Sequence, residues 1–532
     1  MKKWIGLIAI VIISFSMMLT GCTPSKSSQN SDKRKDELVI SLGGEPDTGF
    51  DPTTGWGRYG SPLFQSTLFK RDHALTIVND LATNYEVSQD GKIWTVTLRD
   101  DVHFSDGKPL TAKDVEFTFE TAMTNGSVVD LTGLEKVEAI NDTTVKFTLK
   151  EAQSTFMNSL VAIGIVPKHA YGKDYAENPL GSGPYQLVQW DKGQQLIVKE
   201  NPEYYGHKPY FQKITFLFLN EDAAFAAAGA GEVDVAAIPA SFSRQQVPGM
   251  RLEKVKTVDN RGIVFPYVKS GALTEEGFPI GNDVTADPAI RQAINIAVDR
   301  GVLIDGVLEG YGSKAYTSVD HLPWWNQETV FEDGDVDGAK TILMDSGWKD
   351  EDSDGILEKG SLKAEFSLYY PAEDDIRQSL AITVADMLKP LGISIKVEGA
   401  SWDTIEQKMH SNAVLMGWGS HDPHEMVNVY SSKYAGIDYY NPGFYQNEKV
   451  DDYMTKALTA TDLNQAMEYW KKAQWDGTTG VSAKGDAPWA WLVNIDHLYL
   501  VKDGLSIGKQ SIHPHGHGWP VTSNIEEWKW AE

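Results

Sequence analysis

The sequence predicts a protein of at least two lobes that contain both strands and helices. Its 532 residues are more than one hydrophobic core usually serves, so the chain should divide. Residues 95–99 alternate apolar and polar side chains with the two-residue period of a strand. Thr111 followed by Asp114 begins an amphipathic helix, and residues 287–300 place apolar side chains on one helical face.

The chain begins with a predicted secretory signal peptide, residues 1–21. Lys2 and Lys3 precede an apolar run that is too short and wrongly flanked to be the membrane span of a large domain. The run ends in Leu-Thr-Gly-Cys, which resembles a bacterial lipobox and implies cleavage before Cys22 and acylation of its thiol. We therefore expect a lipoprotein.

A flexible tether, residues 22–37, is expected next. Its polar side chains cannot bury enough surface to offset the entropy lost on ordering. The folded part, which opens with an apolar strand at 38–42, should then work outside the membrane and close to it. Because Cys22 is the only cysteine, disulfides, thiolate metal sites and a cysteine nucleophile are excluded from the folded part.

The composition argues against a nucleic-acid partner and against catalysis. A net charge of −26 repels phosphates, and no basic stripe with interleaved aromatic side chains occurs. The chain has no HExxH, GxSxG, P-loop or paired dinucleotide glycines. We expect a protein that is not an enzyme, with a cell-surface hydrolase using Asp422 and His421 as the remote alternative.

The segment 416–433 has the composition of the lip of a binding site. It begins at the last of three apolar residues, 414–416, that are typical of a buried strand end, and Gly417 and Gly419 allow another group to approach closely. The segment then offers an indole, two imidazoles and a carboxylate, from Trp418, His421, His424 and Asp422. The alternative is a surface turn whose aspartate caps the next helix.

A loop near the start of the folded part also carries candidate binding residues. Residues 47–62 are rich in Gly and Pro, yet they include the large side chains of Trp56, Arg58 and Tyr59. A loop with so many large side chains is more typical of a functional site than of a simple connection.

Three histidines near the end of the chain are candidate metal ligands. His513, His515 and His517 alternate with Pro and Gly, and imidazole suits nickel, copper and zinc. The alternative is a terminal loop packed by Trp519, in which the histidines are solvated or hydrogen-bonded.

The segment 350–355 begins like a calcium loop. It has acids at alternate positions and a glycine sixth, but the twelfth position is Ser361 instead of the bidentate glutamate that such a loop requires. We therefore predict a solvated turn before a strand.

Several segments together resemble one known family. The strand and helix pattern of residues 90–120 resembles the signature of the family 5 extracellular solute-binding proteins. These are the nickel-, dipeptide- and oligopeptide-binding components of ABC importers. Matches that support the resemblance extend over residues 38–532, at 180–185, 201–206, 231–235, 287–300 and 438–444.

The resemblance implies an α/β protein with the two-lobed periplasmic-binding-protein-like fold of type II, cluster C. A hinge should join the lobes, and a small subdomain should be inserted in the first lobe. The expected ranges are 38–83, 179–269 and 496–532 for lobe I, 84–178 for the inserted subdomain and 270–495 for lobe II.

The function that the resemblance implies is capture of a small solute between the lobes and its delivery to an ABC permease and ATPase complex. The protein should be a monomer, lipid-anchored on the extracellular side of the bacterial cell membrane, without a resident cofactor. The residues expected to bind the solute are Trp56, Arg58, Tyr59, Trp418, His421, Asp422, His424 and Tyr440.

The solute stays open between two classes. Peptide binders of the family carry an acid three positions after the tryptophan, where this chain has His421. Nickel binders are similar to this chain in the Asp-Pro-His step at 422–424. Residues 159–167 lack the arginine of some nickel-chelate binders, and we expect Arg58 to replace it. Nickel or another metal chelate therefore stands marginally ahead of a di- or oligopeptide.

Overall fold

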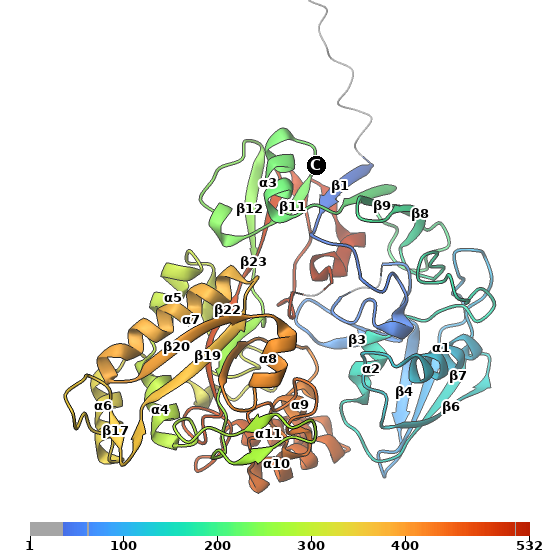
Figure 1. Ribbon diagram of the computed structural model, residues 1–532. Coiled ribbons are helices and arrows are strands. Elements are labelled where there is room, and N and C mark those ends of the chain that lie inside the picture. Colours follow the sequence, from blue (N-terminus) through green and yellow to red (C-terminus); the bar gives the residue numbers. More distant parts are fainter. Residues whose placement is uncertain (1–35, 61–62, 517, 532) are drawn as a thin grey trace, which may run out of the picture.

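The computed structural model describes residues 36–60, 63–516 and 518–531 (Figure 1). These residues form three main sheets, of seven, six and four strands, together with helices, as the sequence predicts for an α/β protein. The predicted signal peptide, the tether up to residue 35 and the lipidation site Cys22 lie outside the described residues.

The first lobe is built on the seven-stranded sheet. Its strand β1 (Glu37–Ser41) pairs in parallel with β10 (Lys213–Leu217) on one side and with β11 (Val235–Ile238) on the other. In order across the sheet the strands are β12 (Met250–Val255), β23 (His497–Lys502), β11 (Val235–Ile238), β1 (Glu37–Ser41), β10 (Lys213–Leu217), β9 (Gln195–Glu200) and β8 (Tyr185–Asp191). The predicted first strand is therefore present, one residue earlier than expected.

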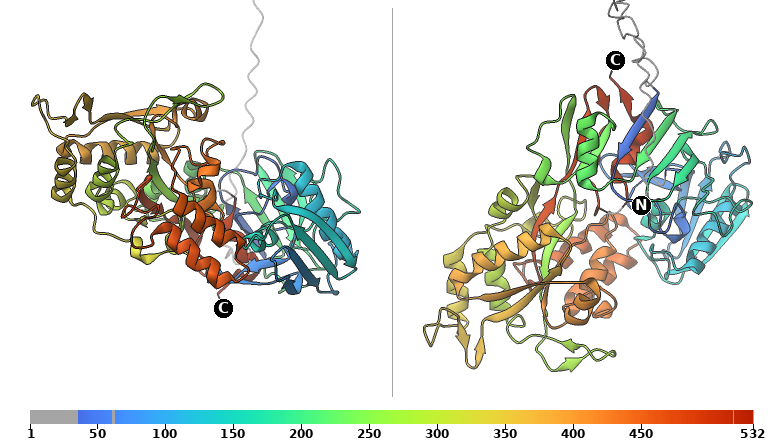
Figure 2. Two further views of the ribbon diagram at one scale, coloured as in Figure 1. Left: turned by 90° about the horizontal axis from the view of Figure 1, so that it is seen from below. Right: turned by 45° about the horizontal axis from the view of Figure 1, so that its top comes forward.

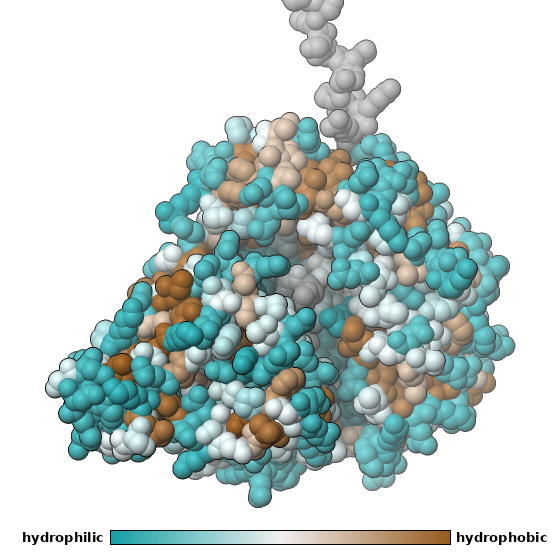
Figure 3. All heavy atoms as spheres, viewed as in Figure 1, coloured by the Kyte–Doolittle hydropathy of each residue, from teal (hydrophilic) through white to brown (hydrophobic). Residues whose placement is uncertain are grey.

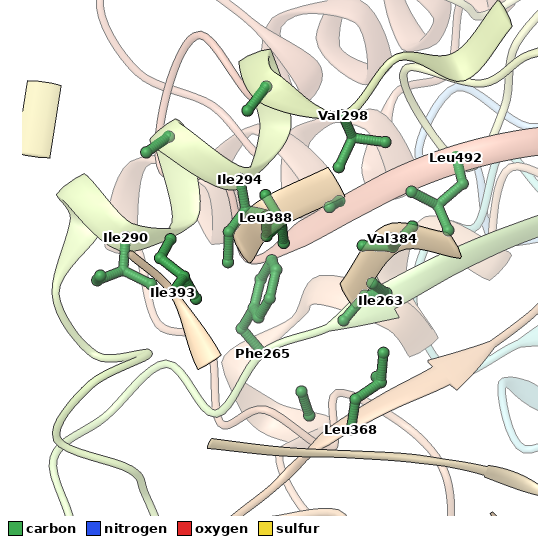
Figure 4. Packing of buried hydrophobic residues seen from close by; sticks show 14 of the residues in the cluster. Ile263, Phe265, Ile290, Ile294, Val298, Leu368, Val384, Leu388, Ile393 and Leu492 are labelled. Carbon is green, nitrogen blue, oxygen red and sulfur yellow. The ribbon is translucent and has the colours of Figure 1, made fainter. Parts of the chain in front are cut away.

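The second lobe is built on the six-stranded sheet. In order its strands are β16 (Gly312–Lys314), β22 (Trp489–Ile495), β13 (Asn260–Val264), β21 (Ala413–Met416), β19 (Glu365–Pro371) and β20 (Ser394–Ala400). Neighbouring residues enter different cores: Ile263 and Leu415 on one face, Val264 and Met416 on the other. Figure 4 shows the first of these cores, in which helix residues such as Ile290 pack on the strands. Because both faces are covered, the strands β21 and β22 inside this sheet are almost continuously apolar and buried.

Helices cover the sheets and connect their strands. The α-helices are α1 (Ala112–Asn125), α2 (Phe156–Ala162), α3 (Glu221–Ala230), α4 (Pro288–Ala297), α5 (Arg300–Val307), α6 (Val336–Asp345), α7 (Asp375–Leu388), α8 (Trp402–Lys408), α9 (Glu425–Tyr430), α10 (Glu448–Thr459) and α11 (Leu463–Gln474). In the part of the chain that the structure describes, no helix is both long enough and apolar enough to cross a membrane.

Short elements complete the structure. The two-stranded sheets are β2 (Phe69–Arg71) with β3 (Ile77–Asn79), β14 (Ala272–Leu273) with β15 (Pro279–Ile280), β17 (Glu358–Lys359) with β18 (Leu362–Lys363), and β24 (Leu505–Ser506) with β25 (Lys529–Trp530). The 3-10 helices are η1 (Pro52–Thr54), η2 (Ala240–Phe242), η3 (Gln327–Thr329), η4 (Lys389–Leu391), η5 (Ser432–Tyr434) and η6 (Pro520–Glu527).

The four-stranded sheet and α1 form a separate layer that faces the second lobe across the molecule (Figure 2). Its strands, in order, are β4 (Ala82–Val87), β5 (Ile93–Leu98), β7 (Thr144–Leu149) and β6 (Leu134–Asn141). Val115 and Phe119 of α1 are fully buried against this sheet, and the N–H of Thr111 donates to Asp114 Oδ2 at 2.9 Å. The strand and helix predicted from residues 95–119 are both confirmed.

The chain crosses between the two large sheets twice, from β12 to β13 and back from β22 to β23. Lobe I was expected to continue to residue 269, but β13 pairs with β21 and β22 of the second sheet, so the first crossing comes earlier. We call residues 256–259 the crossing segment. Thr257 Oγ1 donates to the carbonyl of Ile495 at 2.5 Å and thereby ties the two crossings together.

The predicted helix at 287–300 is divided in two. Its predicted apolar face is buried as expected, but α4 ends where Val298 adopts an extended ψ of 118°. Asp299 then caps α5, since its Oδ1 accepts from the N–H groups of Gly301 and Val302 at 2.8 and 3.1 Å. The aspartate favours a helix start over a helix interior, which explains the break.

The buried side chain of Arg300 provides a test of the second lobe. It donates to the carbonyls of Asn295, Ala315 and Trp491 and faces Asp333 at 3.5 Å. We expect Arg300→Met to destabilise the protein by about 3–5 kcal/mol, because it leaves several buried carbonyls without their donor and removes one of the two cations beside Asp333, the other being Lys314. Calorimetric and denaturant unfolding measure the loss.

The control for this prediction is Lys389→Met. Within the described part of the chain the ammonium of Lys389 pairs with Asp386, and both side chains are exposed. A surface ion pair of this kind contributes at most about 1 kcal/mol, so the control should unfold close to the wild type. Equal stability of the two variants would contradict the role given to Arg300.

Candidate functional site

The two glycines beside Trp418 lie against the crossing segment and the start of β13. A Cβ atom at Gly417 would lie 2.4 Å from the carbonyl oxygen of Asn260, and one at Gly419 would lie 2.3 Å from that of Val258. Gly419 also has a φ of 146°, which L side chains rarely adopt. The close approach that these two glycines allow is therefore that of the backbone joining the two lobes.

Hydrogen bonds hold the same contact. The N–H of Trp418 donates to Asn260 Oδ1 at 2.9 Å, and the N–H of Asn260 donates to the carbonyl of Trp418 at 3.1 Å. The N–H of His515 donates to the carbonyl of Gly419 at 2.7 Å, which adds the end of the chain to this contact.

A cavity of about 280 Å³ opens beside this segment, between the second lobe, the first lobe and the inserted subdomain. Figure 3 shows the surface hollowed between the two halves of the molecule. The predicted residues that line the cavity are Arg58, Tyr59, Trp418, His421, Asp422, His424 and Tyr440. The remaining one, Trp56, lines an adjoining cavity of about 480 Å³ that shares Arg58 and Tyr59. The fold thus brings together residues that are far apart in the sequence.

The wall from the first lobe presents a cation over an aromatic ring. The guanidinium carbon of Arg58 lies 4.5 Å from the ring centroid of Tyr59. Trp56 is only 7% exposed and packs edge-on against Phe50 and Trp519, with ring centroids 4.8 and 5.4 Å apart. Most of the Trp56 indole therefore belongs to the core of the first lobe, and only its rim reaches the cleft.

The wall from the second lobe presents two aromatic side chains. The rings of Trp418 and Tyr440 lie 6.0 Å apart with an interplanar angle of 35°. The Nε1 atom of Trp418 is buried and has no hydrogen-bond partner. An indole N–H left in this way is a donor that a bound solute can satisfy.

A chain of hydrogen bonds crosses the cleft. Arg71, at the end of β2, donates to Asn158 Oδ1 at 2.5 Å and to the carbonyl of His421 at 2.8 Å. Asn158 in turn donates to Asp422 Oδ1 at 3.2 Å. Burial lowers the pKa of Arg71 to about 10 and raises that of Asp422, so the arginine is charged at neutral pH.

The two histidines of this wall differ in environment. Burial, assisted by the charge of Arg71, lowers the pKa of His421 to about 3, so its imidazole is neutral at pH 7. Its Nε2 atom is buried without a hydrogen-bond partner. The Nε2 atom of His424 lies 4.0 Å from Asp130 Oδ2 of the inserted subdomain. The alternative interpretation, in which Asp422 caps the helix that follows, is also supported, because Asp422 Oδ1 accepts a hydrogen bond from the N–H of His424 at 2.9 Å.

The terminal histidines do not converge in the described residues. His513 is buried, and its Nδ1 lies 3.1 Å from that of His497. His515 Nδ1 bonds Asp259 Oδ1 at 2.5 Å, while His517 lies outside the described residues. Among the described residues, no group of three potential metal-ligating side chains lies in the cleft. The metal-ligand role of these histidines stays a prediction.

Several residues that line the cavity were not predicted from the sequence, and four of them make contacts described in this section. They are Arg71, Asp130, Asn158 and Glu425. Arg71 lies in β2, Asp130 in the loop before β6 and Asn158 in α2. The residues next to them in the sequence give no sign of a binding site. Glu425 had a local signal: it stands six residues after Gly419 at the start of a helix, where a carboxylate binds free N–H groups.

The contact between Gly419 and the crossing segment can be tested by adding one carbon atom. We expect Gly419→Ala to cost about 1–3 kcal/mol and to weaken solute binding, because its Cβ would collide with the carbonyl of Val258. Gly504→Ala is the matched control, since Gly504 has a φ of 83° but open space around it. Thermal unfolding should separate the two, and equal losses would disprove the steric contact.

The buried carboxyl of Glu425 should produce a pH dependence. It accepts from the N–H groups of Gly419 and Ser420 at 3.1 and 3.2 Å, and burial raises its pKa from 4.5 to about 7. Between those pH values the folded protein binds more protons than the unfolded chain, so this group lowers stability as pH rises through the window.

Glu425→Gln should remove this contribution. The stability of the variant minus that of the wild type should therefore be larger at pH 8 than at pH 5. Thermal unfolding at both pH values measures this difference. Glu406→Gln on the exposed face of α8 serves as the control. A difference between wild type and Glu425→Gln that does not change with pH would contradict the raised pKa.

Comparisons with known proteins agree with the fold. The family model described as "Bacterial extracellular solute-binding proteins, family 5 Middle" matches residues 76–440. Protein XP55 of Streptomyces lividans is 32% identical over 513 residues, which cover 93% of this chain and 90% of that protein. The oligopeptide-binding protein AppA of Bacillus subtilis is 27% identical over 502 residues, which cover 86% of this chain and 88% of that protein.

Solved structures support the same assignment. NikZ from Campylobacter jejuni, in complex with Ni(L-His), is 26% identical with a TM-score of 0.75, covering 93% of this chain and 99% of that chain. AppA of Bacillus subtilis in complex with a nonapeptide is 25% identical with a TM-score of 0.68, covering the same shares. The predicted two-lobed fold is confirmed. The chain belongs to the family 5 bacterial extracellular solute-binding proteins, the solute-binding components of ABC importers.

Proposed function

We propose that the solute is a transition-metal chelate, nickel among the candidates, held by its organic part and by imidazole. The observation that carries this proposal is the buried, unpartnered Nε2 atom of His421 on the wall of the cavity. Neutral imidazole is a common ligand of nickel, copper and zinc. His424 stands on the same wall and adds a second imidazole.

A chelate fits the cleft better than a bare ion. No group of three ligating side chains lies in the described part of the cleft, so most metal ligands must come from the solute. A chelator usually carries carboxylates, and Arg58, a half-buried residue, lines both adjoining cavities. Arg58 would bind a carboxylate, in a bidentate manner where the geometry permits, while Tyr59 and Trp418 stack on the solute.

Capture is binding without chemistry. The solute would contact Arg58 and Tyr59 from one lobe and Trp418 and His421 from the other, so it favours the closed arrangement by its differential affinity. The permease and ATPase complex would recognise that closed form. We propose that the lipid on Cys22 anchors the monomeric protein on the extracellular side of the cell membrane.

A di- or oligopeptide is the second candidate. A third cavity of about 940 Å³, lined by Asp222, Glu373 and other acids, adjoins the cavity of about 480 Å³. The combined volume of the cleft is large for a small chelate. The relative AppA of Bacillus subtilis binds a nonapeptide in its solved structure. One observation counts against a peptide. Asp422, the acid nearest to the position at which peptide binders of the family carry theirs, already accepts hydrogen bonds from Asn158 and from the N–H of His424.

The solute can be identified on protein purified from its natural host without denaturation. We expect native mass spectrometry to detect a small organic ligand and elemental analysis to detect about one transition-metal ion per chain. Dialysis against a strong chelator should remove both together. Peptides recovered without metal would refute the chelate and support the second candidate.

Single substitutions then test which side chains hold the solute. We expect His421→Ala and Arg58→Met each to weaken chelate binding by at least about tenfold, which corresponds to about 1.4 kcal/mol. His207→Ala, an exposed histidine of the first lobe outside the cleft, is the control and should bind normally. Unchanged affinity in His421→Ala, measured by calorimetric titration, would exclude imidazole ligation at this position.

A further inference from the structure

Four carboxylates gather in the loop between α6 and β17, at the end of the second lobe that lies away from the inserted subdomain in Figures 1 and 2. Asp350, Asp352 and Asp354 stand at alternate positions, and Glu358 follows as the first residue of β17. One oxygen each of Asp350, Asp352 and Glu358 lie within 4.8 Å of one another. The loop is thus folded around a common point.

Glu358 is the buried member of this cluster. It is only 7% exposed, and its Oε2 accepts from the N–H of Glu351 at 2.9 Å. Its Oε1 is buried and accepts no well-aligned hydrogen bond, although the ammonium of Lys363 lies near it. A buried carboxylate oxygen without a hydrogen bond is costly unless a cation approaches it. The solvated turn that the sequence predicts at 350–355 is confirmed, because these residues are exposed, and the buried carboxyl of Glu358 follows it at the start of the next strand.

The positive charge nearest to this oxygen is the ammonium of Lys363. Its Nζ lies 3.2 Å from Glu358 Oε1 and 3.1 Å from Asp352 Oδ2, and it also contacts Asp354. The Lys363 side chain is 38% exposed, so its long flexible stem can turn toward solvent. A single ammonium leaves most of the charge of four carboxylates unbalanced.

The backbone of the loop already orients the three aspartates. Asp350 accepts from the N–H groups of Ser353 and Gly355, Asp352 accepts from that of Asp354, and Asp354 accepts from that of Ile356. In Asp352 and Asp354 these backbone groups use only Oδ1, so Oδ2 of each is left to a cation. These are the oxygens that the Lys363 ammonium contacts.

We propose that residues 350–358 bind one calcium ion. The available side-chain ligands are all carboxylate oxygens on a loop, which suits a hard cation with a flexible coordination shell. Glu358, at the ninth position, takes the part of the acid that is absent at Ser361, and the β17–β18 hairpin replaces the second helix of a helix–loop–helix site. The ion fastens this loop to the hairpin.

Calcium uptake by the full chain is the direct test. Protein stripped with EDTA should bind one calcium ion per chain in a calorimetric titration with CaCl₂. The affinity should be near the range of about 10⁻⁴–10⁻³ M that extracellular modules show. Thermal unfolding should shift to higher temperature with CaCl₂ and less with MgCl₂. Absence of saturable uptake, or an equal effect of both salts, would overturn the proposal.

Variants locate the ion within the chain. Asp350→Asn combined with Asp352→Asn, and separately Glu358→Gln, should each weaken calcium binding at least tenfold and abolish the thermal shift. The matched control, Asp403→Asn combined with Glu406→Gln on exposed α8, should bind calcium normally. If both loop variants keep the wild-type affinity, calcium binds elsewhere and the proposal fails.

Lys363→Met separates a calcium site from a simple ion-pair cluster. Because the ammonium competes with the ion, its removal should tighten calcium binding and make the thermal shift larger. If calcium neither binds this variant more tightly nor raises its unfolding temperature, then the carboxylates serve only the lysine.

Discussion

The contact between the Gly417–Gly419 turn and the backbone that joins the lobes constrains the rest of this protein. Trp418 and Asn260 exchange hydrogen bonds. Gly417 and Gly419 lie so close to backbone carbonyl oxygens that a Cβ atom at either position would collide with one of them. The indole that we propose faces the solute is therefore hydrogen-bonded to the backbone that joins the lobes. In the proposed function, this direct contact couples solute binding to closure of the lobes.

The cleft combines desolvated charges with unsatisfied polar atoms. The hydrogen bonds from Arg71 through Asn158 to Asp422 reach from the first half of the chain to the second lobe. Nearby, Trp418 Nε1 and His421 Nε2 have no partner. A solute that supplies partners to these atoms gains their interaction energy in the closed form, whereas an apolar solute of the same shape leaves them unsatisfied. This favours polar, charged ligands over apolar ones.

How well the sequence predicted the site depended on how local each signal is. Trp418, His421, Asp422 and His424 are contiguous, and the glycines that mark a close approach stand beside them. The group that approaches could not be foreseen, because Val258 and Asn260 are about 160 residues away along the chain. The division of the 287–300 helix was missed because apolar spacing continues across Asp299, while the cap geometry decides where the axis changes.

By itself the sequence determined the properties that depend on local patterns. These are the alternation of strands and helices, the strand that ends at Met416, the helix begun at Thr111, the family resemblance and the exclusion of cysteine chemistry from the folded part. Only the tertiary structure decided which charges meet. It brought Arg71 to Asn158, separated His513 from His515 by giving each a different partner, and buried Glu358 under an exposed acidic loop. The physical reason is that burial and ion pairing depend on contacts between segments distant in the sequence, and no local pattern of residues specifies them.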